Sequence, residues 1–150
     1  MNNDIAVMIN NIKLNVRVGI IFKYQDLVLI EIPRINFNNS VIPGGRMKIG
    51  EYSKDTIKRE IKEEMNFDLE ESKIKLITTI EGMFTFDNID YHEIFFVYKY
   101  EVDEYDYQSL SKIKENCDSH NSDYKFITKD DFVKYNLLPF ELRDIINNIK

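Results

Sequence analysis

Three glutamates, Glu60, Glu63 and Glu64, are the residues whose type and spacing best suit chemistry in this chain. A helix turns about 100° per residue, so Glu63 and Glu64 would lie within about 60° on either side of Glu60. Like charges at these spacings destabilise a helix by roughly 0.2–0.5 kcal/mol per pair. A partner cation would remove that cost, and hard divalent ions such as Mg²⁺ take oxygen ligands. The cluster therefore indicates a metal site.

A helix is expected to position these carboxylates. Ile57, Ile61 and Met65 recur every four residues, which is typical of a helical face packed on a core. Ser53 is the expected N-cap, and the helix should run to about Met65. Asn66 tolerates a left-handed backbone and would end the helix there. The acidic face would then lie beside the buried edge of the helix.

A solvated charged face is the alternative, because Arg59 and Lys62 could neutralise much of the repulsion. The context favours the metal site. The acidic run follows a Pro-Gly-Gly turn at 43–45 and adjoins the apolar stripe of the same helix.

The segment from Gly45 to Phe67 resembles the Nudix box. That pattern reads Gly, five residues, Glu, seven residues, Arg-Glu-aliphatic-any-Glu-Glu-any-Gly-aliphatic. Gly45, Glu51 and residues 59–64 occupy its fixed positions, whereas Asn66 and Phe67 replace the last glycine and the final aliphatic residue. Asn ends helices much as Gly does, so the departure at position 66 leaves the acidic face unaffected.

The resemblance implies a fold and an activity. The expected fold is a Nudix-type α/β/α sandwich, in which a mixed β-sheet lies between the box helix and a C-terminal helix. The expected enzyme is a Mg²⁺- or Mn²⁺-dependent hydrolase. It would cleave the diphosphate linkage of a nucleoside diphosphate joined to another group, with water attacking phosphorus.

The resemblance also implies roles for individual residues. Glu60 and Glu64 would be direct metal ligands, joined by Glu63 and by the backbone carbonyl of Gly45. The metal ions would neutralise phosphoryl oxygens and lower the pKa of a bound water.

Arg59 and Glu51 are expected to pair and to hold the loop against the helix. The general base stays open between a box glutamate and a carboxylate outside the box. The outside candidates are Glu81, Glu93, Glu104 and Glu115.

Glu93 stands in the sequence Tyr-His-Glu-Ile at 91–94, which resembles a His-Glu-Ile sequence in a bacterial subgroup of the family. The alternative for Glu93 is a charge on an edge strand that discourages aggregation.

Several residues are candidates for contact with the substrate. Arg34 and Arg46 could donate bidentate hydrogen bonds to phosphates, and Arg46 directly follows the Gly-Gly turn. Phe37, Phe84 and Phe86 could stack on a base, although aromatic residues in a strand-rich domain are more often part of the core. The nucleoside diphosphate derivative itself is not specified by any further motif.

The remaining pattern predicts mainly strands, with a loop and a final helix. Strands are expected at 13–22, 27–32, 41–42, 73–81, 91–102 and 124–128, a surface loop at 103–123, and a helix from about 138 to 149.

Composition fits one domain over residues 1–150, with 43% hydrophobic residues. A net charge of −6 argues against duplex nucleic acid or an anionic membrane as partner. The single Cys117 excludes an internal disulfide, and the start lacks a basic n-region, so a cytoplasmic location is expected.

Three alternatives stay open. An exposed strand could pair two subunits into a homodimer. The domain could instead be a catalytically silent nucleotide-binding sensor that keeps the fold and the metal site. A structural or partner-binding protein with a coincidental acidic helix is the third alternative.

Overall fold

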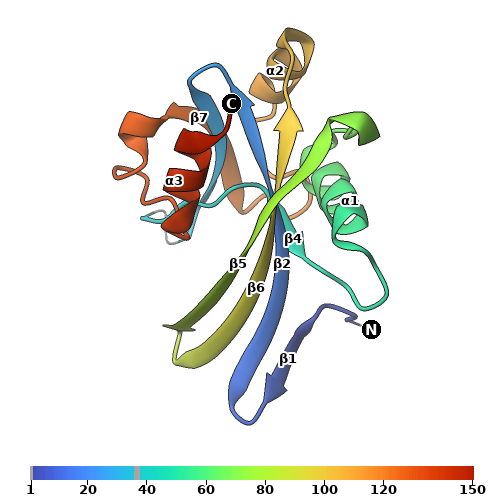
Figure 1. The fold of residues 1–150 in the computed structure, drawn as a ribbon, viewed down its shortest axis with the longest axis vertical. Helices are drawn as coiled ribbons and strands as arrows, with labels where there is room; N and C mark the ends of the chain where they lie inside the picture. Colours follow the sequence, from blue (N-terminus) through green and yellow to red (C-terminus); the bar gives the residue numbers. More distant parts are fainter. Residues whose placement is uncertain (1, 36–37) are drawn as a thin grey trace.

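A seven-stranded mixed sheet forms the centre of the protein in a computed structural model that describes residues 2–35 and 38–150 (Figure 1). The main strands run in the order β5-β6-β2-β3-β7, while β1 and β4 pair with the N-terminal part of β2. Strands β2 and β6 are parallel, and the other pairs are antiparallel. The strands are β1 (Ala6–Ile9), β2 (Ile12–Tyr24), β3 (Leu27–Pro33), β4 (Gly44–Arg46), β5 (Ile74–Phe86), β6 (Ile89–Glu101) and β7 (Ser122–Thr128).

Helices cover both faces of this sheet. Alternate side chains of a strand point to opposite faces, so Val18 and Ile20 of β2 pack with helix α1 (Ser53–Met65) and Ile21 packs with helix α3 (Glu141–Asn148). Figure 1 shows α1 and α3 on opposite sides of the strands. The predicted α/β/α sandwich with a mixed sheet is confirmed.

Helix α1 ends at Met65 as predicted, but it begins one residue earlier than predicted and a different residue caps its start. The N-cap is Tyr52, and Ser53 is the first helical residue, with its hydroxyl 2.6 Å from the hydroxyl of Tyr98. The prediction of Ser53 as N-cap was therefore wrong, because this side chain bonds to β6 instead of to the helix. At the other end Asn66 is left-handed, with φ 50° and ψ 37°, as predicted.

The predicted loop at 103–123 contains a helix, α2 (Glu104–Ser111), so this prediction was wrong in part. Asp103 caps it: its carboxylate accepts from the Asp106 amide at 2.8 Å, and its own amide donates to the Asp106 carboxylate at 3.2 Å. Leu110 is buried in the core on the α1 side. Eight residues are too few to show a sustained apolar period, which is why the pattern missed this helix.

Two strands also differ from expectation. The predicted strand at 41–42 makes only an isolated bridge between Glu31 and Val41, and the strand that pairs with β2 is β4. The glycines explain the shift, because a Cβ at Gly44 would overlap the carbonyl oxygen of Val18. Strand β1 was not predicted.

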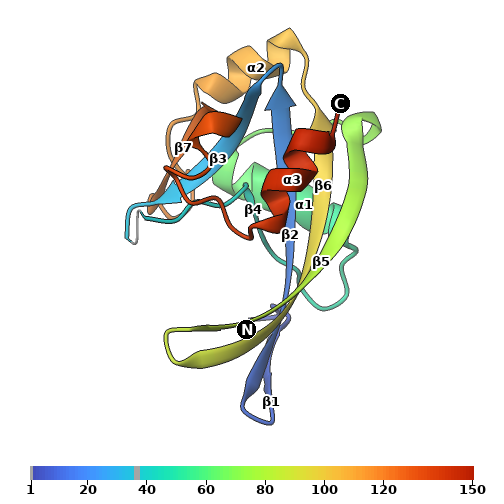
Figure 2. The same ribbon diagram turned by 60° about the vertical axis from the view of Figure 1, so that its left-hand side comes forward.

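Two hairpins, β1–β2 and β5–β6, extend well beyond the helices (Figure 2). Their ends carry large apolar side chains that are exposed. None of the helices within 2–35 and 38–150 has the length and apolar character needed to cross a membrane. The exposed residues of the hairpins include Val7, Met8, Ile9, Ile12, Met83, Phe84 and Phe86.

Candidate active site

The three carboxylates of α1 have different surroundings. Ile57, Ile61 and Met65 are buried against the sheet and fix the rotation of the helix. The side chain of Glu60 is 13% exposed and turns inward, whereas that of Glu63 is 45% exposed. Glu63 lies 3.3 Å from Arg59 on the outer side of the helix. The structure therefore brings Glu60 together with Glu64 and leaves Glu63 at the rim.

Gly45 lies directly against Glu60 of this acidic pair. A Cβ at position 45 would overlap both oxygens of the Glu60 carboxylate, so only glycine allows β4 and α1 to approach so closely. The register sets Gly45 opposite Val18 in β2. The backbone of Gly45 and the Glu60 carboxylate therefore share one small region, as a common ligand set would require.

Arg59 pairs with Glu51, as the sequence predicts. Its guanidinium donates to the two Glu51 oxygens at 2.7 and 3.1 Å, and to Glu60 at 2.9 Å. Glu51 also accepts from the amide of Lys48 and the hydroxyl of Thr56. The hydrogen bonds from Arg59 chiefly lower the pKa of Glu51 to about 2. This network ties the loop after β4 to α1 and orients Glu60.

Glu64 is surrounded by other carboxylates. Burial, followed by the nearby charges of Glu31 and Glu60, raises the pKa of Glu64 to about 9. Burial likewise raises the pKa of Glu60. One oxygen of Glu64, Oε2, is buried without a hydrogen-bond partner among the described residues. A cation beside this pair would offset both the repulsion and the unmet hydrogen-bonding capacity.

Glu31 of β3 is an acidic neighbour that the sequence analysis missed. Its carboxylate accepts from Ser122 at 2.6 Å and from Asn116 at 3.4 Å. Tyr124, only 4% exposed, has a hydroxyl without a partner among the described residues. Burial, followed by the charges of Glu31 and Glu64, raises the pKa of this hydroxyl. A charged residue inside the apolar run 27–32 was the available signal for Glu31.

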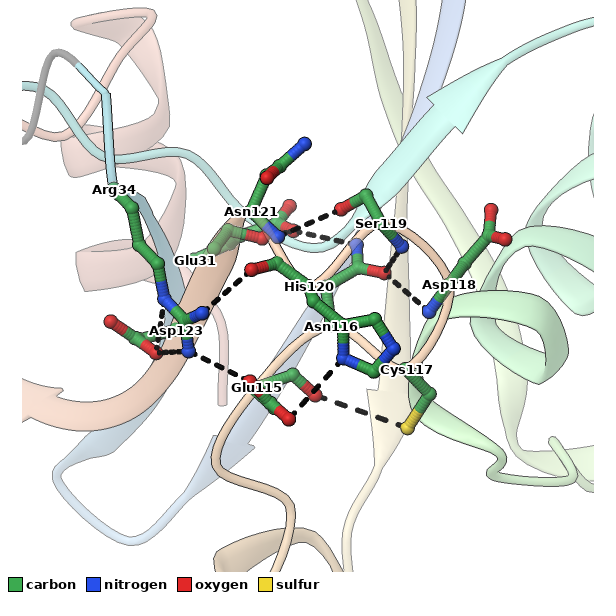
Figure 3. Close-up of polar contacts among 11 residues, drawn as sticks. Glu31, Arg34, Glu115, Asn116, Cys117, Asp118, Ser119, His120, Asn121 and Asp123 are labelled. Atoms are coloured by element: carbon green, nitrogen blue, oxygen red, sulfur yellow. Dashed lines mark hydrogen bonds and ion pairs between the residues drawn. The ribbon is translucent and has the colours of Figure 1, made fainter.

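Arg34, predicted to meet phosphates, lies in a clasp on the surface (Figure 3). Its guanidinium is 2.8 Å from both Glu115 and Asp123 and donates to the carbonyl of His120 at 2.6 Å. The clasp fixes the loop at 115–121, and the Cys117 amide in this loop donates to the carbonyl of Glu64 at 2.7 Å. Arg34 therefore helps to place a loop beside the end of α1.

The other predicted substrate residues lie on the opposite face of the sheet from Glu60 and Glu64. Arg46 donates to Asn15 at 2.9 Å, and Glu93 accepts from Asn15 at 2.8 Å. Strand β6 lies between β5 and β2, so the alternative of Glu93 as an edge-strand charge was wrong. Phe84 stacks on Tyr91 with ring centroids 5.2 Å apart.

The remaining candidates are those for the general base and for stacking on a base. Glu81 and Glu104 are exposed, and the Glu115 carboxylate is engaged in the Arg34 clasp. Phe86 is 55% exposed near the tip of the β5–β6 hairpin. Phe37 lies outside the described residues.

The donor set fits a hard divalent ion that is only partly enclosed by protein. Within 2–35 and 38–150, no three carboxylate, imidazole or thiol groups converge closely enough to hold a metal unaided. Mg²⁺ commonly uses one or two carboxylates together with waters and substrate phosphates. The Glu60–Glu64 pair, with the unpartnered oxygen of Glu64, meets that requirement.

Comparisons with known proteins agree with this geometry. The protein-family model for the NUDIX domain matches residues 13–148. No curated protein matches the chain.

Solved structures share the fold at low sequence identity. A MutT NUDIX hydrolase from Burkholderia pseudomallei has a TM-score of 0.65 at 17% identity, covering 91% of this chain and 98% of its own. A MutT protein from Bacillus halodurans has a TM-score of 0.64 at 19% identity, covering 89% and 80%. An Ap4A hydrolase from C. elegans has a TM-score of 0.57 at 14% identity, covering 89% and 92%. The match of the family model over nearly the whole chain establishes that this protein belongs to the NUDIX family of hydrolases.

Proposed function

We propose that the protein is a Mg²⁺- or Mn²⁺-dependent hydrolase of a small nucleoside diphosphate derivative, which it cleaves at the diphosphate linkage by water attack at phosphorus. The observation that carries this proposal is the partly buried Glu60–Glu64 pair, in which Glu60 packs against Gly45. If no cation bound between them, substitution of one of these two carboxylates by a neutral residue would stabilise the protein.

The residues of α1 divide the work between them. Glu60 and Glu64 would hold the ion, with the carbonyl of Gly45 as a further oxygen and Glu63 reaching in from the rim. When bound, the ion would neutralise phosphoryl oxygens and lower the pKa of an attacking water. Arg59 keeps Glu60 aimed at the site by its bond at 2.9 Å, and Glu51 fixes Arg59 in turn. These are the groups that we assign to the hydrolytic centre.

The substrate would lie over β4, which pairs only with β2 among the described strands. Arg46 is the better placed of the two predicted phosphate donors, because Arg34 is engaged by Glu115 and Asp123. Phe84 is 44% exposed and offers one aromatic surface to a base. Substrates of this kind are small molecules, and the net charge of −6 disfavours duplex nucleic acid and anionic membranes.

A cytoplasmic location and a homodimer stay predictions. The exposed apolar ends of the two hairpins favour contact with a second copy of the chain. The second candidate function, a silent nucleotide sensor, would use the same acidic pair to bind without turnover.

The test is a panel assay for release of phosphate or nucleoside monophosphate. The panel contains nucleoside triphosphates and diphosphates, ADP-ribose, sugar nucleotides and dinucleoside polyphosphates, each with Mg²⁺, Mn²⁺ or EDTA. We expect metal-dependent release from at least one member and its loss in Glu64→Gln. Silence across the panel, with Mg²⁺ still raising the melting temperature, would favour the sensor.

A further inference from the structure

A group of four polar side chains lies on the sheet face opposite α1. Asn15 and Arg17 come from β2, Arg46 from β4 and Glu93 from β6. Asn15 is 3% exposed and Glu93 is 8% exposed, so the amide and the carboxylate are buried. Asn15 donates to Glu93 at 2.8 Å and accepts from Arg46 at 2.9 Å, and Arg17 lies 3.6 Å from Glu93. We name these four residues the guanidinium cluster.

The charges in this cluster do not balance. Arg17 and Arg46 stand directly opposite each other in the antiparallel pair of β2 and β4. Like charges in that position destabilise a sheet, and the single carboxylate of Glu93 neutralises only one of them. The cluster thus keeps one excess positive charge in a protein whose net charge is −6. A partner anion would remove that cost.

The two guanidinium groups are also held in place with donors to spare. Arg46 uses Nε for Asn15, and its two terminal nitrogens have no hydrogen-bond partner among the described residues. Arg17 lies over the ring of Phe95, 5.1 Å from its centroid, which fixes the plane of the guanidinium. Paired forks of this kind match the oxygens of a phosphate.

The cluster is linked to the hydrolytic centre through one residue. The carbonyl of Arg46 accepts from Arg59 of α1 at 3.2 Å, while its side chain lies on the other face. The hydrolytic centre and the guanidinium cluster therefore adjoin the same short strand, β4, which pairs only with β2 among the described strands.

We propose that Arg17 and Arg46, positioned by Asn15 and Glu93, bind the phosphate of the substrate that is not attacked. That the bound phosphate belongs to the substrate rests on the proposed function, but the anion site itself does not depend on turnover. Glu93 is then a positioning residue, because its buried carboxylate accepts from Asn15 and forms an ion pair with Arg17 on the face opposite Glu64.

The experiment measures binding of ADP and of inorganic pyrophosphate by calorimetry in EDTA, where hydrolysis cannot contribute. We expect Arg17→Ala and Arg46→Ala each to weaken binding about tenfold or more, since each removes charge-assisted hydrogen bonds. Lys75→Ala removes the same charge from an exposed surface pair with Glu101 and should bind like the wild type. Arg17→Lys and Arg46→Lys keep the charge, and they test the forked geometry if an alanine variant fails to fold.

Kinetics on the panel substrate separate the role of Glu93 from that of a general base. Glu93→Gln can still accept from Asn15, so we expect KM to change while kcat stays within about threefold of the wild type. Loss of kcat with unchanged KM and unchanged ADP binding would make Glu93 a catalytic base and overturn its positioning role. Failure of the wild type to bind either anion, or equal binding by the arginine variants and Lys75→Ala, would overturn the anion site. Arginine-dependent binding without any turnover would instead refute only the hydrolase.

Discussion

The carboxylate of Glu60 occupies the space where a side chain at Gly45 would begin. Strand β4 and helix α1 therefore touch through a glycine backbone and an acid group, with nothing between them. The contact explains why this position must lack a Cβ, and it makes the geometry of the acidic pair sensitive to a single methyl group.

Gly45→Ala should displace Glu60 from the pair. We expect the rise in melting temperature on adding Mg²⁺ to disappear and turnover to fall by at least about tenfold, because the new Cβ overlaps the carboxylate. Gly82→Ala is the matched control for metal-dependent stability, since the nearest atom to a Cβ there is 3.8 Å away. An unchanged Mg²⁺ response in Gly45→Ala would remove Glu60 from the metal site.

Arg59→Ala should damage stability and rate together. It leaves the largely buried carboxylates of Glu51 and Glu60 without their shared partner, and we expect a loss of about 2 kcal/mol in the free energy of unfolding. Urea denaturation and kcat on the panel substrate check this. Arg59→Lys keeps the charge but not the bidentate contact, so its stability and rate should lie between those of the wild type and those of Arg59→Ala. If Arg59→Ala is as stable as the wild type, Arg59, Glu51 and Glu60 act as independent surface charges and not as a network.

Binding of Mg²⁺ should release a proton near neutral pH. Because the pKa of Glu64 is raised from 4.5 to about 9, the metal-free protein holds this proton at pH 7, and an ion must displace it. Apparent affinity should therefore increase with pH and level off above about 9. The same shift means that stability from neutral Glu64 is fully present below pH 4.5 and is lost as pH rises through 9.

Calorimetric titration of Mg²⁺ in two buffers with different ionisation enthalpies would count the released protons. Glu64→Gln supplies the control, since it cannot release one. Equal heats in the two buffers for the wild type would show that Glu64 is already ionised.

Asn66→Gly should stabilise the protein slightly and leave activity unchanged. Asn66 has φ 50° at the end of α1, and glycine adopts this conformation without strain, so we expect a gain of up to about 1 kcal/mol. Asn66→Ala should lose about 1 kcal/mol for the opposite reason. Thermal denaturation and turnover are the two readouts. A loss of turnover in Asn66→Gly without a loss of stability would give this side chain a second role.

Tyr124→Phe separates stability from function beside Glu31. The hydroxyl is buried without a partner among the described residues, so its removal should raise the free energy of unfolding by about 1 kcal/mol in EDTA. If the hydroxyl serves a bound ion or its waters, affinity for Mg²⁺ should fall in the same variant. Urea denaturation in EDTA and calorimetry with Mg²⁺ measure the two effects. A less stable variant in EDTA would show that the hydroxyl has a partner after all.

Sequence reasoning succeeded where the determinants are local. The bounds of α1 follow from Ile57, Ile61 and Met65, and its left-handed end follows from Asn66, all within a few turns of one helix. It failed where distant strands meet. The bond between Asn15 and Glu93 joins residues that are 78 positions apart and depends on the parallel register of β2 and β6.

The same limit applies to the acidic site. Glu31 lies near Glu64 because β3 places it on the α1 face of the sheet, where the pairing of β3 with β7 also brings Ser122 and Tyr124. No spacing along the chain reports such a contact. The hydrolytic motif could therefore be predicted from the sequence, whereas the residues around it could be identified only from the folded structure.

The alternation along β2 has a consequence for how this enzyme can diverge. Val18 and Ile20 pack against helix α1, whereas Asn15 and Arg17, which come earlier in the same strand, face the other side of the sheet. Under the anion site that we propose, substitutions of Asn15 and Arg17 would alter ligand preference and leave α1 in place. Alternate residues of β2 would thus allow substrate selectivity to change during evolution while the reaction is preserved. This separation requires that the register of the strand does not shift by one residue.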